Sequence, residues 1–170
     1  MAQYLIANGA MQTTQSFVAV TTGTSLKTMM QVKPSATKQA KIIEWGISFD
    51  GSAAATPGKV ELIETDTSAT VTAYVANDLT KWDSDALQGG DPTTNLIQVG
   101  TQASGYTATT ESTPTAVRNL DVPQFIAPTT QYKYPYPLGR EPVIQTGKYA
   151  RIRVLFGTAV NAYCYMIVEV

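Results

Sequence analysis

The stretch from Ala150 to Val170 constrains the fold most, because its apolar residues recur at every second position in two successive runs. Such an alternation is typical of a β-strand that buries one face. Gly157-Thr158 separates the runs and supplies a turn, so we expect a β-hairpin that lies inside a sheet. The alternating apolar positions are Ala150, Ile152, Val154 and Phe156, followed by Ala162, Cys164, Met166, Val168 and Val170.

The same alternation recurs in shorter segments that end at glycine, proline or Asp-Gly turns. The longest is 38–50, where we expect Trp45 to anchor the core and Gly46 to mark a bulge or a close backbone approach. Segments 60–65 and 70–76 are expected to form another hairpin. Helical periodicity is almost absent, so the sequence predicts an all-β fold, either an antiparallel β-sandwich or a jelly roll.

The chain of 170 residues fits a single domain spanning 1–170. We interpret residues 1–15 as an extended N-terminal arm, held either by its own domain or by a neighbouring copy. Residues 77–105 are expected to form a long polar loop region, and loops of that length are usually functional. The patch Tyr4, Leu5 and Ile6 and this long loop are therefore our candidate contact surfaces.

Charged residues are scarce, at 15% of the chain against the usual ~25%. A thinly charged surface packs against other proteins at a low desolvation cost, so composition favours assembly. The formal net charge is -1 and no basic stripe stands out, so nucleic acid is not an expected partner. No apolar run approaches ~20 residues and no secretory signal is visible, so we expect no membrane partner.

The sequence contains few residue patterns that indicate a catalytic site. The chain has no histidine, which excludes Ser-His-Asp and Cys-His nucleophiles and histidine metal sites. Its one cysteine, Cys164, lies on an apolar strand face and is expected to be a small buried hydrophobe rather than a reactive thiol.

Two groups of acidic residues are candidate chemical sites. Asp83, Asp85 and Asp91 lie near Gly89-Gly90 and offer oxygen ligands for calcium, but a solvated turn explains them more simply. Paired carboxylates can hydrolyse glycosides, and the candidates are Glu44, Glu61 and Glu64. Exposed strand faces carry glutamates routinely, so we expect no catalytic residue, no cofactor and no metal.

Aromatic and basic residues supply further candidates for contact. An extended segment interrupted by prolines, an edge strand at best, carries Tyr132, Tyr134 and Tyr136 on one face. With Trp82 they form either a sugar-binding platform or, as we prefer, a protein contact. The outward face of the strand after Ala150 carries Arg151 and Arg153. These arginines either pair with a partner's carboxylates or keep that face exposed to solvent.

Several segments resemble small virion structural proteins of tailed bacteriophages, and the match runs from about residue 22 to the end. These segments look like turn and packing signatures rather than catalytic motifs. They are EWGISFDGSAA (44–54) with Pro57 and Val60-Glu61-Leu62, GYTA (105–108), PTTQY (128–132), YPLGREP (136–142), RIRV (151–154) and NAYCY (161–165).

The resemblance implies a non-enzymatic capsid decoration or cement protein, made in the host cytoplasm and bound to the outside of a phage head. It implies two partners, the major capsid protein and copies of this chain, arranged as a homotrimer. Attachment to several capsid subunits at once would stabilise the shell through multivalent contact. The alternatives are a tail-associated structural protein and a surface-exposed carbohydrate-binding module. A hydrolase that uses the paired carboxylates is a third hypothesis.

Overall fold

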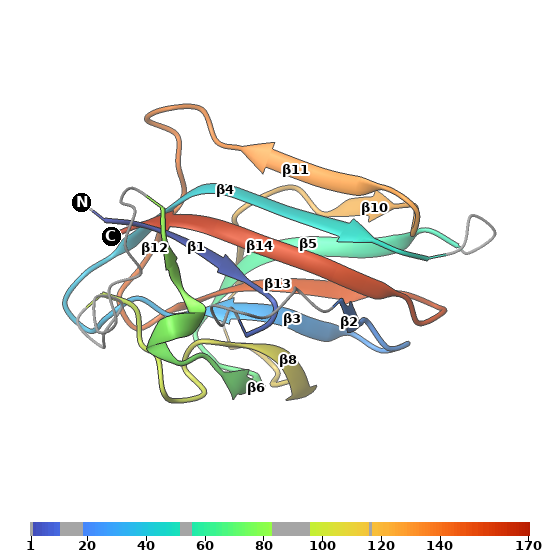
Figure 1. Ribbon diagram of the computed structural model, residues 1–170, viewed down its shortest axis with the longest axis horizontal. Helices are drawn as coiled ribbons and strands as arrows, with labels where there is room; N and C mark the ends of the chain where they lie inside the picture. The colour runs from blue at the N-terminus through green and yellow to red at the C-terminus, as the bar shows by residue number, and fades with distance from the viewer. Residues whose placement is uncertain (1, 11–18, 52–55, 83–95, 116) are drawn as a thin grey trace.

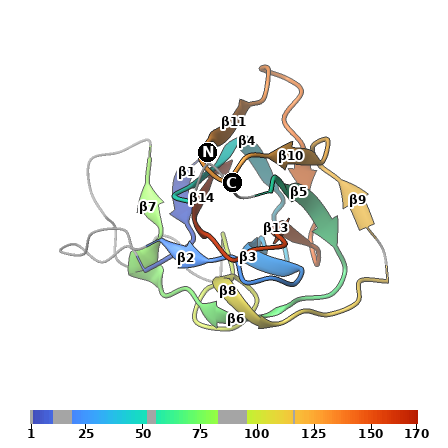
Figure 2. The same ribbon diagram turned by 90° about the vertical axis from the view of Figure 1, so that its right-hand side faces the viewer.

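The computed structural model describes residues 2–10, 19–51, 56–82, 96–115 and 117–170. Its strands form two antiparallel sheets, A and B, that pack face to face (Figures 1 and 2). The expected all-β sandwich is therefore confirmed. No helix among the described residues has the length and apolar character needed to cross a membrane.

Sheet A contains both ends of the described chain. Its order is β11 (Gln131–Pro135), β4 (Ala40–Phe49), β14 (Asn161–Glu169), β1 (Gln3–Ala7) and β7 (Thr80–Lys81), with β12 (Val143–Ile144) on β4 and β2 (Val20–Thr21) on β14. The long strands β4 and β14 pair over most of their length and form its centre. Their register shifts between Ile167 and Val168, which leaves Ile43 as the extra residue of a bulge.

Sheet B is built around β13. Its order is β10 (Gln124–Ile126), β5 (Gly58–Thr65), β13 (Tyr149–Leu155), β3 (Lys27–Val32), β8 (Gly105–Thr110) and β6 (Thr70–Ala73), with β9 (Val117–Asn119) on β5. A single 3-10 turn, η1 (Ala76–Asp78), is described between β6 and β7.

Both strands of the C-terminal stretch exist, but the hairpin expected between them is wrong. β13 pairs with β3 and β5 in sheet B, whereas β14 pairs with β1, β2 and β4 in sheet A. Residues 156–160 therefore cross from one sheet to the other. The apolar faces of β13 and β14 oppose each other across the core, and alternation alone does not distinguish that arrangement from two neighbours in one sheet.

The second expected hairpin is also wrong. β5 pairs with β9, β10 and β13, while β6 pairs with β8. Both strands lie in sheet B, but β13, β3 and β8 separate them. Sequence neighbours were therefore not sheet neighbours in either case.

The interface between the sheets forms the hydrophobic core. Trp45 of β4 is fully buried there, as expected, and so are Ile152 of β13 and Met166 of β14. Cys164 is also buried, and burial raises the pKa of its thiol well above the ordinary value. It is the small buried hydrophobe that the sequence predicted.

The segment interpreted as an arm is partly a strand of the sandwich. β1 lies between β14 and β7 and is paired with both, so its own domain holds it. Tyr4 and Ile6 point into the core and are fully buried, while Leu5 points to the outer face of sheet A. Expecting all three as contact surface was wrong for Tyr4 and Ile6, because a strand sends alternate side chains to opposite faces. Residues 11–15 lie outside the described part.

Candidate functional site

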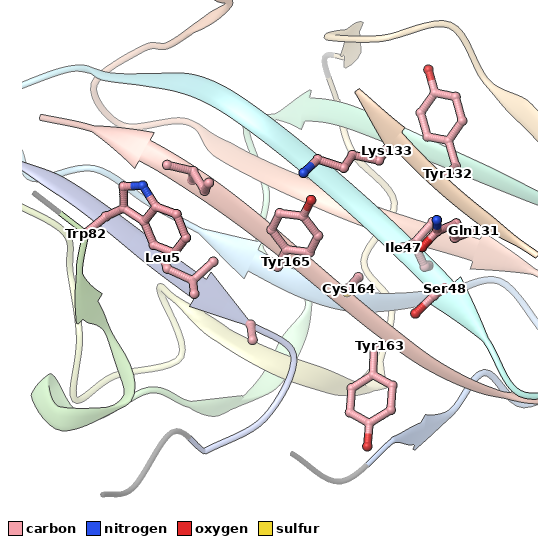
Figure 3. Close-up of a pocket in the computed structure, with 12 residues that line it drawn as sticks. Leu5, Ile47, Ser48, Trp82, Gln131, Tyr132, Lys133, Tyr163, Cys164 and Tyr165 are labelled. Carbon is pink, nitrogen blue, oxygen red and sulfur yellow. The ribbon is translucent and has the colours of Figure 1, made fainter. Parts of the chain in front are cut away.

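The outer face of sheet A contains an apolar hollow of about 360 Å³, which we call the aromatic groove (Figure 3). Three strands and the residue after β7 supply its main side chains: Leu5, Lys133, Tyr163, Tyr165, Ile167 and Trp82. On β14 the core-facing Cys164 and Met166 alternate with the outward-facing tyrosines. The groove is therefore the outward half of the same alternation that builds the core.

Aromatic rings dominate the accessible part of the groove. Trp82 exposes 55% of its surface and Tyr163 exposes 37%. Figure 3 shows Trp82 beside Leu5 at one end, with Tyr165 in the middle and Tyr163 at the far side. Large rings that combine an apolar body with a polar tip are enriched where proteins bind partners.

Gly46 of β4 creates the space in which the Tyr165 ring lies. A Cβ atom at Gly46 would come within 2.6 Å of Cε1 of that ring. The sequence predicted either a bulge or a close backbone approach here. The close approach is confirmed, whereas the bulge lies at Ile43.

A short polar chain closes one side of the groove. The Tyr165 hydroxyl donates to Oε1 of Glu44 at 2.5 Å, and Nζ of Lys133 lies 3.0 Å from the same oxygen. Burial, and then the hydrogen bond to the Glu44 carboxylate, raises the pKa of Tyr165 well above its ordinary value. The hydroxyl therefore stays a neutral donor at physiological pH.

The outer face of sheet B is chemically different, because its arginines form ion pairs that are more buried than the Lys133–Glu44 pair of sheet A. Glu61 of β5 pairs with Nζ of Lys59 at 2.6 Å, and it also accepts from Arg153. Burial by itself raises the pKa of Glu61, but the hydrogen bond from Lys59 and the charge of Arg153 outweigh it and hold the pKa below its ordinary value. Arg153 was expected to meet a partner or solvent, and it pairs within its own chain instead.

Arg151 is the largest departure from the expected outward arginines, because it is fully buried. Its guanidinium pairs with Glu111 and donates to the Thr28 hydroxyl. It also donates to the Thr67 carbonyl and the Ser112 hydroxyl. Burial lowers the pKa of Arg151, although the nearby Glu111 carboxylate opposes that effect. Loops of the same chain have therefore folded over this part of sheet B.

Tyr132, Tyr134 and Tyr136 lie along the edge strand β11 and its continuation, as expected. Their rings contact one another in sequence, with centroids 6.4 Å and 5.0 Å apart. The Tyr132 hydroxyl and the Trp45 indole N–H both donate to Oδ2 of Asp121, at 2.9 Å each. Asp121 thus ties the edge of sheet B to sheet A, and Tyr132 is turned toward that contact rather than toward Trp82.

The candidate hydrolytic carboxylates are not brought together. Glu44 lies on sheet A, whereas Glu61 and Glu64 lie on sheet B and point to opposite faces of β5. Glu64 pairs with Arg118 at 2.9 Å and accepts from the backbone N–H of Gln145. Each carboxylate is engaged by cations or donors of its own chain.

Metal ligation has no support in the described ranges, where no three Asp, Glu, Cys or His side chains gather in a way that would hold an ion. The expected calcium alternative at Asp83, Asp85 and Asp91 lies outside the described residues, as does the middle of the 77–105 loop region, residues 83–95. Trp82, the last described residue before that gap, lies on the aromatic groove.

Sequence reasoning missed Tyr163, Tyr165 and Ile167 as candidate contact residues. The available signal was their position, since three large apolar or aromatic side chains occupy the outward face of the last strand, where polar residues are usual. Comparisons of the chain with protein-family models, with curated proteins and with solved structures find no match, so the phage resemblance stays a prediction.

Proposed function

We propose that this chain is a non-enzymatic structural protein of a bacteriophage particle, which binds the outside of the head and stabilises the shell. The proposal places attachment on the aromatic groove. The observation that carries it is the contrast between the two outer faces: the arginines of sheet B are paired and partly covered by their own chain, while sheet A presents exposed rings.

The physical argument concerns what each face gains on contact. Burying exposed rings such as Trp82 and Tyr163 removes apolar surface from water and stabilises a complex by about 25 cal/mol per Å². A partner on sheet B would have to compete with ion pairs that are already made. Sheet A is therefore the favourable face for a protein partner.

In this proposal the function is mechanical. Each copy covers a junction between capsid subunits, and several weak contacts made at once hold the subunits together. Most side chains of the groove lie on paired strands, so little conformational entropy is lost on binding. A tail-associated structural role would use the same groove on a different partner.

Binding to phage heads that lack this protein tests the proposal. We expect the purified chain to co-sediment with such heads and to raise the temperature at which they release DNA. Trp82→Ala combined with Tyr163→Ala should remove most binding while leaving the fold intact. Val117→Ser is the matched control, because Val117 is exposed to a similar degree on β9 of sheet B. Equal binding of both variants would contradict attachment through the groove.

Carbohydrate binding is a second candidate, favoured by the hydrogen-bonding groups beside the rings. Rings of the groove can stack on the apolar faces of sugars while Glu44 and Lys133 bind hydroxyls. Soaking crystals with oligosaccharides would place sugar density on Trp82 and Tyr165. Density elsewhere, or unchanged tryptophan fluorescence on titration, would argue against this candidate.

A further inference from the structure

A second surface lies on the side of the sandwich where β10 and β11 end the two sheets (Figures 1 and 2). A hollow of about 570 Å³, which we call the edge hollow, opens there between residues 119–123 and 134–140. Its apolar lining includes Val122, Pro123, Tyr134 and Pro137. It is separate from the aromatic groove, with which it shares no lining residue.

Exposed apolar side chains are concentrated around this hollow. Val122 and Tyr134, which line it, expose 69% and 37% of their surfaces, and Leu138, between the lining residues Pro137 and Arg140, exposes 98%. These are three of the ten large hydrophobic side chains that are exposed in the described part of the chain. A cluster of this kind marks an interaction site more often than scattered residues do.

Leu138 is held outward by a tight turn. The Arg140 N–H donates to the Pro137 carbonyl at 2.9 Å, and Gly139 adopts a φ of +82° at the position where a type II turn requires glycine. The turn belongs to the segment YPLGREP, which the sequence analysis singled out and the aromatic groove does not use. Leu138 is therefore a pre-positioned projection beside the hollow.

We propose that this edge is an interface between copies of this chain, in which Leu138 of one copy enters the edge hollow of another. A projection and a hollow on the same patch complement each other only between two molecules. Arg140 and the adjacent Glu141 also give the patch both signs of charge, so each copy offers a carboxylate to the other's guanidinium. A net charge of only -1 keeps repulsion between copies small.

The geometry of the edge favours the same partner. β10 and β11 are terminal strands, and the unpaired backbone N–H and C=O groups of such strands can pair with another chain. Identical edges meet readily in a closed symmetric oligomer. The inference extends the proposed function by assigning the contact between copies, and it uses residues away from the aromatic groove.

Sedimentation over a range of protein concentrations tests the interface. We expect the full chain to reach a multiple of 18.2 kDa. Leu138→Gln should raise the dissociation constant about ten- to hundredfold, the effect of exposing one leucine that the complex buries. Val75→Gln is the matched control, since Val75 is half exposed and lies near η1 at the opposite edge. A chain of 18.2 kDa at every concentration, or equal effects of both variants, would overturn the inference.

Directed cross-linking provides an independent test, because the only native cysteine is buried and unreactive. Chains with Leu138→Cys mixed with chains with Val122→Cys should form a reducible mixed dimer on mild oxidation. Chains with Val75→Cys mixed with either should not. Cross-linking equal to that control would overturn the inference. Head binding is scored separately, so a monomeric chain that still binds heads would overturn this interface and leave the proposed function standing.

Discussion

The two outer faces of the sandwich arise from the same strand alternation but differ in how their outward side chains are used. On sheet B, Lys59 and Arg153 both pair with Glu61, and Arg151 is buried under loops that bond to it. On sheet A, Tyr163, Tyr165 and Trp82 remain accessible around a hollow. The comparison teaches that outward-facing residues are not equivalent: one face contributes to stability, and the other is available for contact.

The largest expected effect is on the covered face. Arg151→Ala removes the cation that faces Glu111 and the donor to Thr28, and it leaves a cavity under the loop. Glu111 retains some solvent contact, so we expect a loss of about 2–4 kcal/mol in the free energy of unfolding. Urea denaturation measures it, with Trp82→Ala as the control on sheet A. An equal loss in both variants would break the contrast between the faces.

The next effect concerns the edge that joins the faces. Asp121→Ala leaves the buried Trp45 indole N–H without its acceptor and releases the Tyr132 hydroxyl. We expect a loss of about 1–3 kcal/mol in the free energy of unfolding. The control is Glu44→Gln beside the aromatic groove, where the Lys133 partner is exposed and a loss below about 1 kcal/mol is expected. Thermal unfolding of both variants measures the two losses. A larger loss of stability for Glu44→Gln than for Asp121→Ala would contradict this interpretation.

The pH dependence of stability should also differ between variants of the two faces. The folded-state pKa of Glu61 lies below its ordinary value of 4.5. Its stabilising contribution is therefore present above that value and is lost as the pH falls through the folded-state pKa. We expect Glu61→Gln to be less stable than the native chain at neutral pH and to approach it in acid. Unfolding curves measured at several pH values test this, and Trp82→Ala should keep the native pH dependence.

The smallest effect on stability is expected in the groove itself. Trp82→Phe should change the free energy of unfolding by no more than about 0.5 kcal/mol, because its ring is mostly exposed. Its effect on fluorescence should be large, since Trp45 is the other tryptophan and is fully buried. Acrylamide should quench the fluorescence of Trp82 in the native chain. In the variant, the fraction of the tryptophan fluorescence that acrylamide can quench should disappear. A partner on the groove should protect Trp82, and unchanged quenching on binding would argue against that contact.

Local pattern predicted the strands better than their partners. The apolar faces of β13 and β14, the buried Trp45 and the edge position of Tyr132–Tyr136 all follow from alternation and from proline positions. Both expected hairpins failed because alternation shows which face of a strand is buried but not which other strands it pairs with. The candidate site was predicted only in fragments: Leu5 and Trp82 line the groove, while Tyr4 and Ile6 belong to the core.

The sequence by itself determined which face of each strand is apolar, because successive side chains of a strand point in opposite directions. It also determined the scarcity of charge and the turn that projects Leu138. Only the tertiary structure decided that residues 156–160 cross between the sheets, that Arg151 is enclosed by residues distant in the chain, and that Trp82 joins Tyr163 and Tyr165. These outcomes depend on long-range pairing, and the free energy of that pairing is shared among strands that no local pattern connects.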